Sequence, residues 1–246
     1  MMFRTGLSLL FVLTLLITLN GVAFGSKDPI VKPLNYEDIG EVKVGYVNPV
    51  VSCQMGNLNS PVWAVGNFLL PPEEYQLLVD PGVTCGSCNY GIMVTRVHVL
   101  LQTAESCNID ISLNVDEAVP YGPGCLGPGP EWSNSGVWHV LVGGAGLWDV
   151  SIPLPTPCLA SPRKYLLSVG IANFQCATGT MPDLVTDGAP TLCTNWNNFG
   201  TGWFDLLAQW PVWPGNLLIF ADVECCTPPV PVEGKTWGAI KSLYRD

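Results

Sequence analysis

Ten cysteines constrain this chain more than any other feature of its sequence, and all of them follow a segment that is typical of an export signal. An even cysteine count in an exported chain favours a disulfide-stapled domain, because disulfides persist in oxidising compartments. We therefore expect the following residues to be oxidised in pairs: Cys53, Cys85, Cys88, Cys107, Cys125, Cys158, Cys176, Cys193, Cys225 and Cys226.

Residues 1–25 have the parts of a signal peptide. Arg4 supplies a positive charge, Leu7–Leu19 is an apolar stretch, and Ala23-Phe24-Gly25 predicts cleavage before Ser26. The rival interpretation is a membrane anchor, but the apolar stretch is shorter than the roughly 20 residues that span a bilayer. We expect a protein that is secreted, extracellular, at the cell surface or periplasmic, with no membrane association after cleavage.

The charge of the mature chain excludes two classes of partner. Without Arg4, nine Lys and Arg residues face twenty Asp and Glu residues, so the net charge is near −11. Nucleic acids and anionic membranes both attract basic patches, and neither is an expected partner.

Turn residues divide the chain into short β-rich runs. The 26 Gly and 22 Pro residues separate segments rich in β-branched and aromatic side chains, which indicates an all-β domain over residues 26–226. We predict a disulfide-stapled antiparallel β-sandwich, jelly-roll-like, with a short C-terminal helix. The expected strands are Glu41–Val51, Val62–Leu70, Tyr75–Val79, Gly91–Thr103, Asn108–Val115, Val137–Val142, Leu147–Ile152, Lys164–Ala172 and Asn216–Val223.

Two of these segments alternate clearly between apolar and polar residues. Within residues 95–102, Val97, Val99 and Leu101 fall on one face of the strand, and the residues on the other face are mostly polar. Ile109–Val115 repeats this pattern. We expect these strands to form an antiparallel pair with one wet face. By contrast, Met181–Leu207 is predicted to be a long irregular loop, and Ser26–Gly40 an extended arm or edge strand.

The C-terminal residues follow a proline-rich spacer at 227–235. In the tail at 236–246, Trp237, Ile240 and Tyr244 fall on one face of a predicted amphipathic helix. The helix either docks back on the sandwich or serves as a recognition tail for sorting machinery.

Several motifs together resemble a group of uncharacterised secreted proteins of environmental Gram-negative bacteria. The resemblance covers most of the mature chain and implies a single β-sandwich with a shared C-terminal tag, but it implies no activity and no catalytic residue. The segments that carry it are Cys85-Gly86-Ser87-Cys88, His98–Gln102, Pro182–Asp187, Trp196–Asp205, Asp222–Cys226 and the Trp-Gly-x-Ile-Lys-x-Leu-Tyr-Arg ending.

The Cys85-x-x-Cys88 motif has three interpretations: a thioredoxin-type redox pair, half of a zinc site, or a structural disulfide. A redox pair needs a helix N-terminus and a zinc site needs two further ligands, and the sequence offers neither. We favour structural disulfides and predict no metal at these cysteines. Proximity suggests the pairings Cys85–Cys88, Cys176–Cys193, and Cys53 with either Cys225 or Cys226.

Asp183, Asp187 and Asp205 are the best enzymatic candidates. Two close carboxylates suffice for glycoside hydrolysis, and the same acids with Asn195 and Asn197 offer oxygen ligands for calcium. We favour turn-forming and capping roles instead. His98 and His139 each lie within a strand, where a lone histidine is typically packed rather than catalytic.

Large aromatic residues gather late in the chain: Trp196, Phe199, Trp203, Phe204, Trp210 and Trp213. They form either core packing or a platform for sugar rings. We therefore predict a structural or binding β-sandwich without catalytic activity, whose partner is a glycan or a surface protein. The alternative is a glycan-binding module or glycoside hydrolase built from Trp196, Trp203, Trp210 and Trp213 with Asp183, Asp187 and Asp205.

Deleting Thr236–Asp246 and following the secreted protein separates the two roles of the tail. A sorting tag predicts retention in the cell or loss from the surface. Normal export combined with a lower melting temperature would instead show that the tail belongs to the fold.

Overall fold

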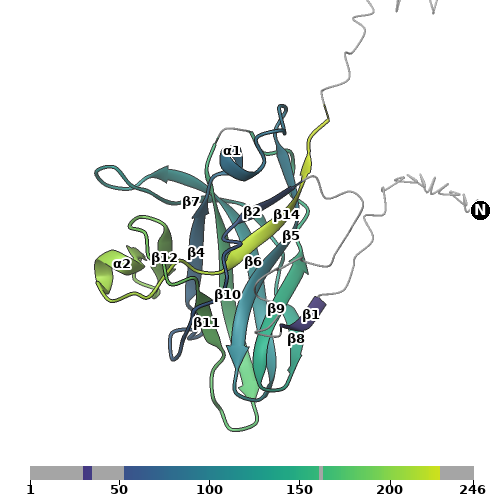
Figure 1. Ribbon diagram of the computed structural model, residues 1–246, viewed down its shortest axis with the longest axis vertical. Coiled ribbons are helices and arrows are strands. Elements are labelled where there is room, and N and C mark those ends of the chain that lie inside the picture. Colours follow the sequence, from purple (N-terminus) through teal and green to yellow (C-terminus); the bar gives the residue numbers. More distant parts are fainter. Residues whose placement is uncertain (1–29, 35–52, 161–162, 228–246) are drawn as a thin grey trace, which may run out of the picture.

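The computed structural model describes residues 30–34, 53–160 and 163–227 (Figure 1). Four predictions lie outside these residues: the signal peptide at 1–25, the strand at 41–51, the spacer beyond Thr227, and the tail helix at 236–246.

Two antiparallel sheets make up the described fold, as predicted. Sheet A contains β1 (Ile30–Leu34), β2 (Cys53–Gly56), β3 (Trp63–Val65), β5 (Ile92–Thr103), β9 (Gly146–Pro153), β11 (Asp183–Thr186) and β14 (Ile219–Cys225). Sheet B contains β4 (Glu74–Val79), β6 (Ser106–Pro120), β7 (Leu126–Asn134), β8 (Trp138–Gly143), β10 (Tyr165–Cys176), β12 (Asn195–Asn198) and β13 (Trp203–Asp205). Within the described ranges the only helices are α1 (Pro81–Thr84) and α2 (Leu206–Gln209), and no helix there is long and apolar enough to cross a membrane.

Each sheet is organised around one long strand. In sheet A, β5 pairs with β9 along one side, while β14 and then β11 share its other side. In sheet B, β6 pairs with β10 on one side, while β8 and then β7 share the other. The remaining strands extend each sheet beyond these pairs. In sheet B, β4, β12 and β13 continue the sheet beyond β10, which gives the order β13-β12-β4-β10-β6.

The alternation seen in the sequence builds the core between the sheets. Val97, Val99 and Leu101 of β5 are buried in one apolar cluster with every second residue of β6, namely Cys107, Ile109, Ile111, Leu113 and Val115. The expectation that these two strands pair with each other was wrong. The turn between them carries the chain from sheet A to sheet B, because each strand finds its partners elsewhere and contributes one face to the shared core.

The predicted wet face of β5 is also corrected. His98 and Leu100 point away from the core, yet their exposed fractions are only 2% and 6%. A second apolar cluster covers this outer face of sheet A, formed by Leu100, Leu147, Val185, Leu218 and Phe220.

All ten cysteines form disulfides, which confirms the predicted stapling. The pairs are Cys53–Cys85, Cys88–Cys225, Cys107–Cys176, Cys125–Cys193 and Cys158–Cys226.

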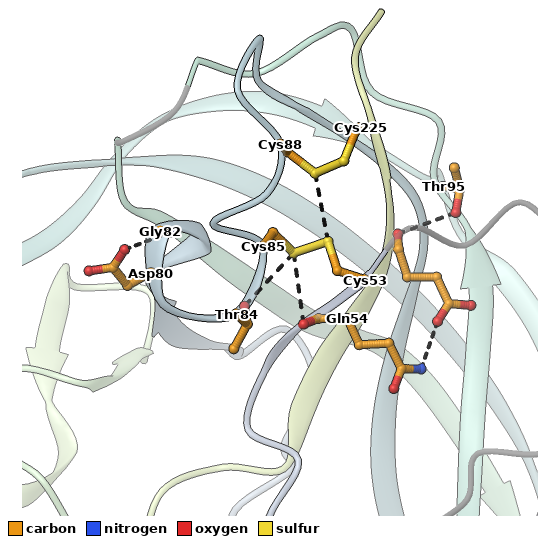
Figure 2. The surroundings of a disulfide bond; sticks show 10 residues. Cys53, Gln54, Asp80, Gly82, Thr84, Cys85, Cys88, Thr95 and Cys225 are labelled. Atoms are coloured by element: carbon orange, nitrogen blue, oxygen red, sulfur yellow. Dashed lines mark hydrogen bonds between the residues drawn. A yellow bond between two sulfur atoms is a disulfide. The ribbon is translucent and has the colours of Figure 1, made fainter.

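The pairings predicted from proximity were wrong. Cys85 and Cys88 belong to two different bridges that lie next to each other, with Cys53 Sγ 4.0 Å from Cys88 Sγ (Figure 2). Both sulfurs are oxidised, so neither a redox thiol pair nor a zinc half-site is present at this motif. A redox pair would need a helix that begins at the motif. The single helical turn α1 lies before it instead, since α1 ends at Thr84.

Sheet register explains the remaining pairings. Cys176 lies directly opposite Cys107 across β10 and β6, so it bonds there rather than to Cys193. Cys225 and Cys226 are successive residues at the end of β14 and point in opposite directions, so they reach the separate partners Cys88 and Cys158.

We predict that the double variant C88S/C225S loses about 2–5 kcal/mol of unfolding free energy. This bridge spans 137 residues, whereas Cys53–Cys85 spans 32, and a longer loop leaves the unfolded chain more freedom when the bridge is removed. Denaturant unfolding without reductant measures the unfolding free energy of this variant and of the control C53S/C85S. The control should lose less unfolding free energy than C88S/C225S, and a larger loss in the control would contradict the loop-length argument.

Candidate functional site

The segment predicted to be a long irregular loop, Met181–Leu207, contains short strands separated by turns and irregular stretches. It contains β11, β12, β13 and the start of α2. The polar composition misled the prediction, because β12 reads Asn-Trp-Asn-Asn and its amides satisfy neighbouring backbone groups inside the sandwich. Asn195 accepts from the Leu217 amide at 2.8 Å, and Asn197 donates to the Glu74 carbonyl at 3.3 Å.

The tryptophans of the predicted ligand platform divide between core and surface. Trp196 and Trp213 have exposed fractions of 1% and 3%, so they present no open face. Trp210 is half-buried and makes edge contacts with Phe68 and Phe199, each at a ring-centre distance of 5.3 Å. Trp203, in β13, is also half-buried. Trp213 therefore belongs to the core between the sheets, whereas Trp196 is buried on the outer face of sheet B, opposite Gln76 and against Tyr121.

The three aspartates lie in separate environments. Asp187 accepts hydrogen bonds from the side chains of Asn57 and Asn59 at 3.0 and 2.9 Å, and from two backbone amides. Burial opposes its ionisation, but these donors outweigh burial and lower the pKa of Asp187. Asp205 caps α2 by accepting from the Ala208 amide at 2.7 Å. Asp187 thus has a turn-forming role and Asp205 a capping role, while half-buried Asp183 has a pKa raised by burial.

His98 lies at the centre of a closed ion-pair cluster on sheet A. Its Nδ1 is 3.0 Å from Asp149 Oδ1 and its Nε2 is 3.3 Å from Asp222 Oδ2, so it links β9, β5 and β14. The ring also stacks on Phe220 at 4.4 Å. Burial lowers the pKa of His98, but the two carboxylates outweigh burial and raise it to about 9. The imidazole is therefore charged at neutral pH and serves to hold three strands together.

A polar row along β6 marks the outer face of sheet B. Every second residue from 108 to 116 is polar, and these residues point away from the core. The row consists of Asn108, Asp110, Ser112, Asn114 and Asp116.

The exposed end of this row forms a pocket of about 380 Å³. We call it the amide pocket, and its lining residues are Asn108, Asp110, His139, Asn173 and Gln175. The sheet register sets His139, Asp110 and Asn173 side by side across β8, β6 and β10. The next row places exposed Leu141 beside Asn108 and Gln175.

The polar groups of the amide pocket are available to a ligand. His139 Nδ1 makes a close contact with Asp110, and the imidazole side chain is 85% exposed. Within the described chain, no hydrogen bond engages the side-chain amides of Asn108, Asn173 or Gln175. The disulfide Cys107–Cys176 joins the two strands beside Asn108 and Gln175 and fixes their spacing.

A second pocket, of about 250 Å³, contains Asp187 and lies between β2 and β4. Its carboxylate already accepts four hydrogen bonds, so it has less to offer a ligand. Among the described residues, no group of three or more His, Cys, Asp and Glu side chains is arranged to hold a metal.

Sequence reasoning missed the amide pocket, although part of its signal was visible. The alternation of Asp110, Ser112 and Asn114 with apolar residues was recognised, but it was interpreted as an ordinary wet face. Asn173, Gln175 and His139 come from other strands, and only the register places them around Asp110.

Residues 52–223 match the family described as Domain of unknown function (DUF7451). The chain belongs to this family. No curated protein matches it.

Two solved structures resemble this DUF7451 domain weakly. One contains the cysteine protease and lectin-like domains of Cwp84, a surface layer associated protein of Clostridium difficile, with 11% identity and a TM-score of 0.39 over 63% of this chain and 33% of that one. The other is a clostridial cysteine protease Cwp84 after propeptide cleavage, with 12% identity and a TM-score of 0.42 over 70% of this chain and 40% of that one. The DUF7451 chain spans well under half the length of either structure.

The His98 cluster predicts a loss of stability at alkaline pH. The folded pKa of about 9 exceeds the unfolded value near 6.5, so the contribution is complete below about pH 6.5 and disappears as pH rises through 9. We expect urea unfolding of the DUF7451 domain to show about 2–3 kcal/mol less stability at pH 9.5 than at pH 6. In the variant His98→Gln, most of this change in unfolding free energy between pH 6 and pH 9.5 should disappear, whereas His139→Gln should retain it. The same change in His98→Gln as in the wild type would show that His98 is not its source.

Proposed function

We propose that this protein is a secreted, non-catalytic module that binds neutral glycans in the amide pocket. The observation that carries the proposal is a set of three amides that have no hydrogen-bond partner among the described residues, Asn108, Asn173 and Gln175, grouped around the contact between Asp110 and His139.

The chemistry of the lining suits vicinal hydroxyl groups. Each amide offers two N–H donors and a carbonyl acceptor, the carboxylate adds acceptors, and the imidazole adds Nε2, since its Nδ1 contacts Asp110. A sugar hydroxyl both donates and accepts, so neighbouring hydroxyls can bridge such groups. Leu141, which is 60% exposed, supplies an apolar neighbour for the C–H face of a sugar ring.

Size, rigidity and charge narrow the class of ligand. The volume of about 380 Å³ falls within the range of small-molecule sites. The cross-strand disulfide holds the amides in place before binding, which reduces the entropy lost on binding. Because the mature chain carries an excess of acidic residues, it repels polyanionic glycans, so neutral glycans fit best.

The proposal keeps the β-sandwich binding role predicted from the sequence but moves the site. The tryptophan and aspartate region at 181–213 contributes to the core and to turn structure, and the glycan site lies on the opposite, β6 side of sheet B. We also propose that the tail, with Trp237, Ile240 and Tyr244, directs sorting or attachment to a surface.

Binding of the oxidised mature chain to an array of neutral oligosaccharides, followed by calorimetry on the strongest ligand, tests the glycan proposal. The double variant N173A/Q175A should weaken affinity about tenfold or more, because each lost hydrogen bond is worth about 0.5–1.5 kcal/mol. Asn89→Ala removes an exposed amide outside the pocket and should bind like the wild type. No binding to any neutral glycan, or equal affinity in the double variant, would refute the proposal.

A further inference from the structure

The buried end of the β6 row holds a second polar group, which we call the carboxylate–amide cluster. Its residues are Glu74, Gln76, Asn114, Asp116 and Ser168. The register aligns Gln76, Ser168 and Asn114 across β4, β10 and β6, and Glu74 and Asp116 each lie two residues along their strands on the same face. Gln76, Asp116 and Asn114 have exposed fractions of 1%, 4% and 6%.

The amide of Gln76 lies between the two carboxylates. Its Nε2 donates to Asp116 in a close contact and to Glu74 Oε1 at 3.4 Å. Asn114 Nδ2 also donates to Glu74 Oε1, at 3.2 Å, and Ser168 Oγ donates to Asp116 Oδ2 at 2.8 Å. In the part of the chain that the structure describes, no ion pair reaches Glu74 or Asp116. The buried carboxylate of Asp116 and the half-buried carboxylate of Glu74 are thus held only by neutral donors among the described residues.

Three oxygens of this cluster are buried without a donor. Seven buried polar side-chain atoms lack a hydrogen-bond partner among the described residues, and the cluster supplies Gln76 Oε1, Asn114 Oδ1 and Asp116 Oδ1. A buried acceptor without a partner costs about 1–3 kcal/mol. Three such acceptors therefore lie together beside two carboxylates, and a cation satisfies this combination of groups.

The electrostatics point the same way. Burial raises the pKa of Asp116 to about 7, and repulsion from Glu74 and Glu131 adds to the rise. Burial also raises the pKa of Glu74. A buried carboxylate becomes stable when it gains a proton or a cation, and a cation is also bound by amide oxygens.

We propose that the carboxylate–amide cluster binds one calcium ion. Calcium takes carboxylate and amide oxygens together, and this cluster offers two carboxylates, two side-chain carbonyls and one hydroxyl, with no nitrogen or sulfur ligand. The nitrogens of Gln76 and Asn114 now face the carboxylates, so a half-turn of each amide is needed to exchange nitrogen and oxygen and present Oε1 and Oδ1 to the cation. Magnesium fits less well, because it retains several waters and the cluster is buried.

This site differs from the calcium site considered from the sequence, which used Asp183, Asp187 and Asp205. It is also independent of glycan binding, because its five residues are separate from those of the amide pocket. Calcium would join β4 to β6 across β10 and stabilise the centre of sheet B.

Calorimetry with calcium chloride on the oxidised mature chain, after removal of metals with EGTA, tests the proposal. We expect saturable binding of one ion per chain and a melting temperature several degrees higher in excess calcium than in EGTA. Terbium, a calcium substitute, should show emission sensitised by Trp196, which lies opposite Gln76 across β12 and β4.

Two variants make the test specific. Asp116→Asn keeps the shape but removes one charge, so it should bind calcium at least a hundredfold more weakly while remaining folded and at least as stable as the wild type in EGTA. Asp183→Asn alters another carboxylate whose pKa burial raises, on sheet A, and should bind calcium normally. Absence of calcium binding by the folded wild type overturns the proposal. Equal calcium affinity in Asp116→Asn overturns it as well.

Discussion

The pleat of β6 is the constraint on which the rest of this structure depends. Because successive residues of a strand point to opposite faces, one 15-residue segment supplies apolar side chains to the core and a polar row to the outer face of sheet B. A shift of one residue in its pairing would exchange the two faces, burying Asp110 and exposing Ile111. The core therefore fixes the register, and the register in turn fixes which polar side chains meet.

Disulfides hold this arrangement at points that the sheets alone would leave weak. Cys107–Cys176 ties β6 to β10 at the end that carries the amide pocket. At the other end of the sandwich, Cys88–Cys225 and Cys158–Cys226 attach the last strand to loops that are distant in the sequence (Figure 1). Figure 2 shows how Gln54 and Thr95 add hydrogen bonds to Asp222 near the first of these bridges. A module with such cross-links keeps its binding groups in place without relying on a large charged surface.

The sequence was sufficient for the fold class and most strands, because alternation and turn residues are local signals. Tyr75–Val79 and Leu147–Ile152 lie within strands with nearly those bounds. It was insufficient for anything set by pairing between distant segments. Cysteine spacing does not reveal that Cys176 faces Cys107, and a lone His98 does not reveal Asp149 and Asp222 on either side. Composition likewise left open whether late aromatics such as Trp196 are packed inside the protein or form a platform, and the structure shows Trp196 buried.

The most direct measurement of the central claim, that the outward side chains of β6 form ligand-binding groups rather than a solvated face, is a crystal structure of the mature chain grown with calcium chloride. The account predicts a cation about 2.3–2.6 Å from Asp116 and the neighbouring carboxylate and amide oxygens. A structure in which Asp116 contacts only protein donors and water, with no cation beside Gln76 and Asn114, would contradict it.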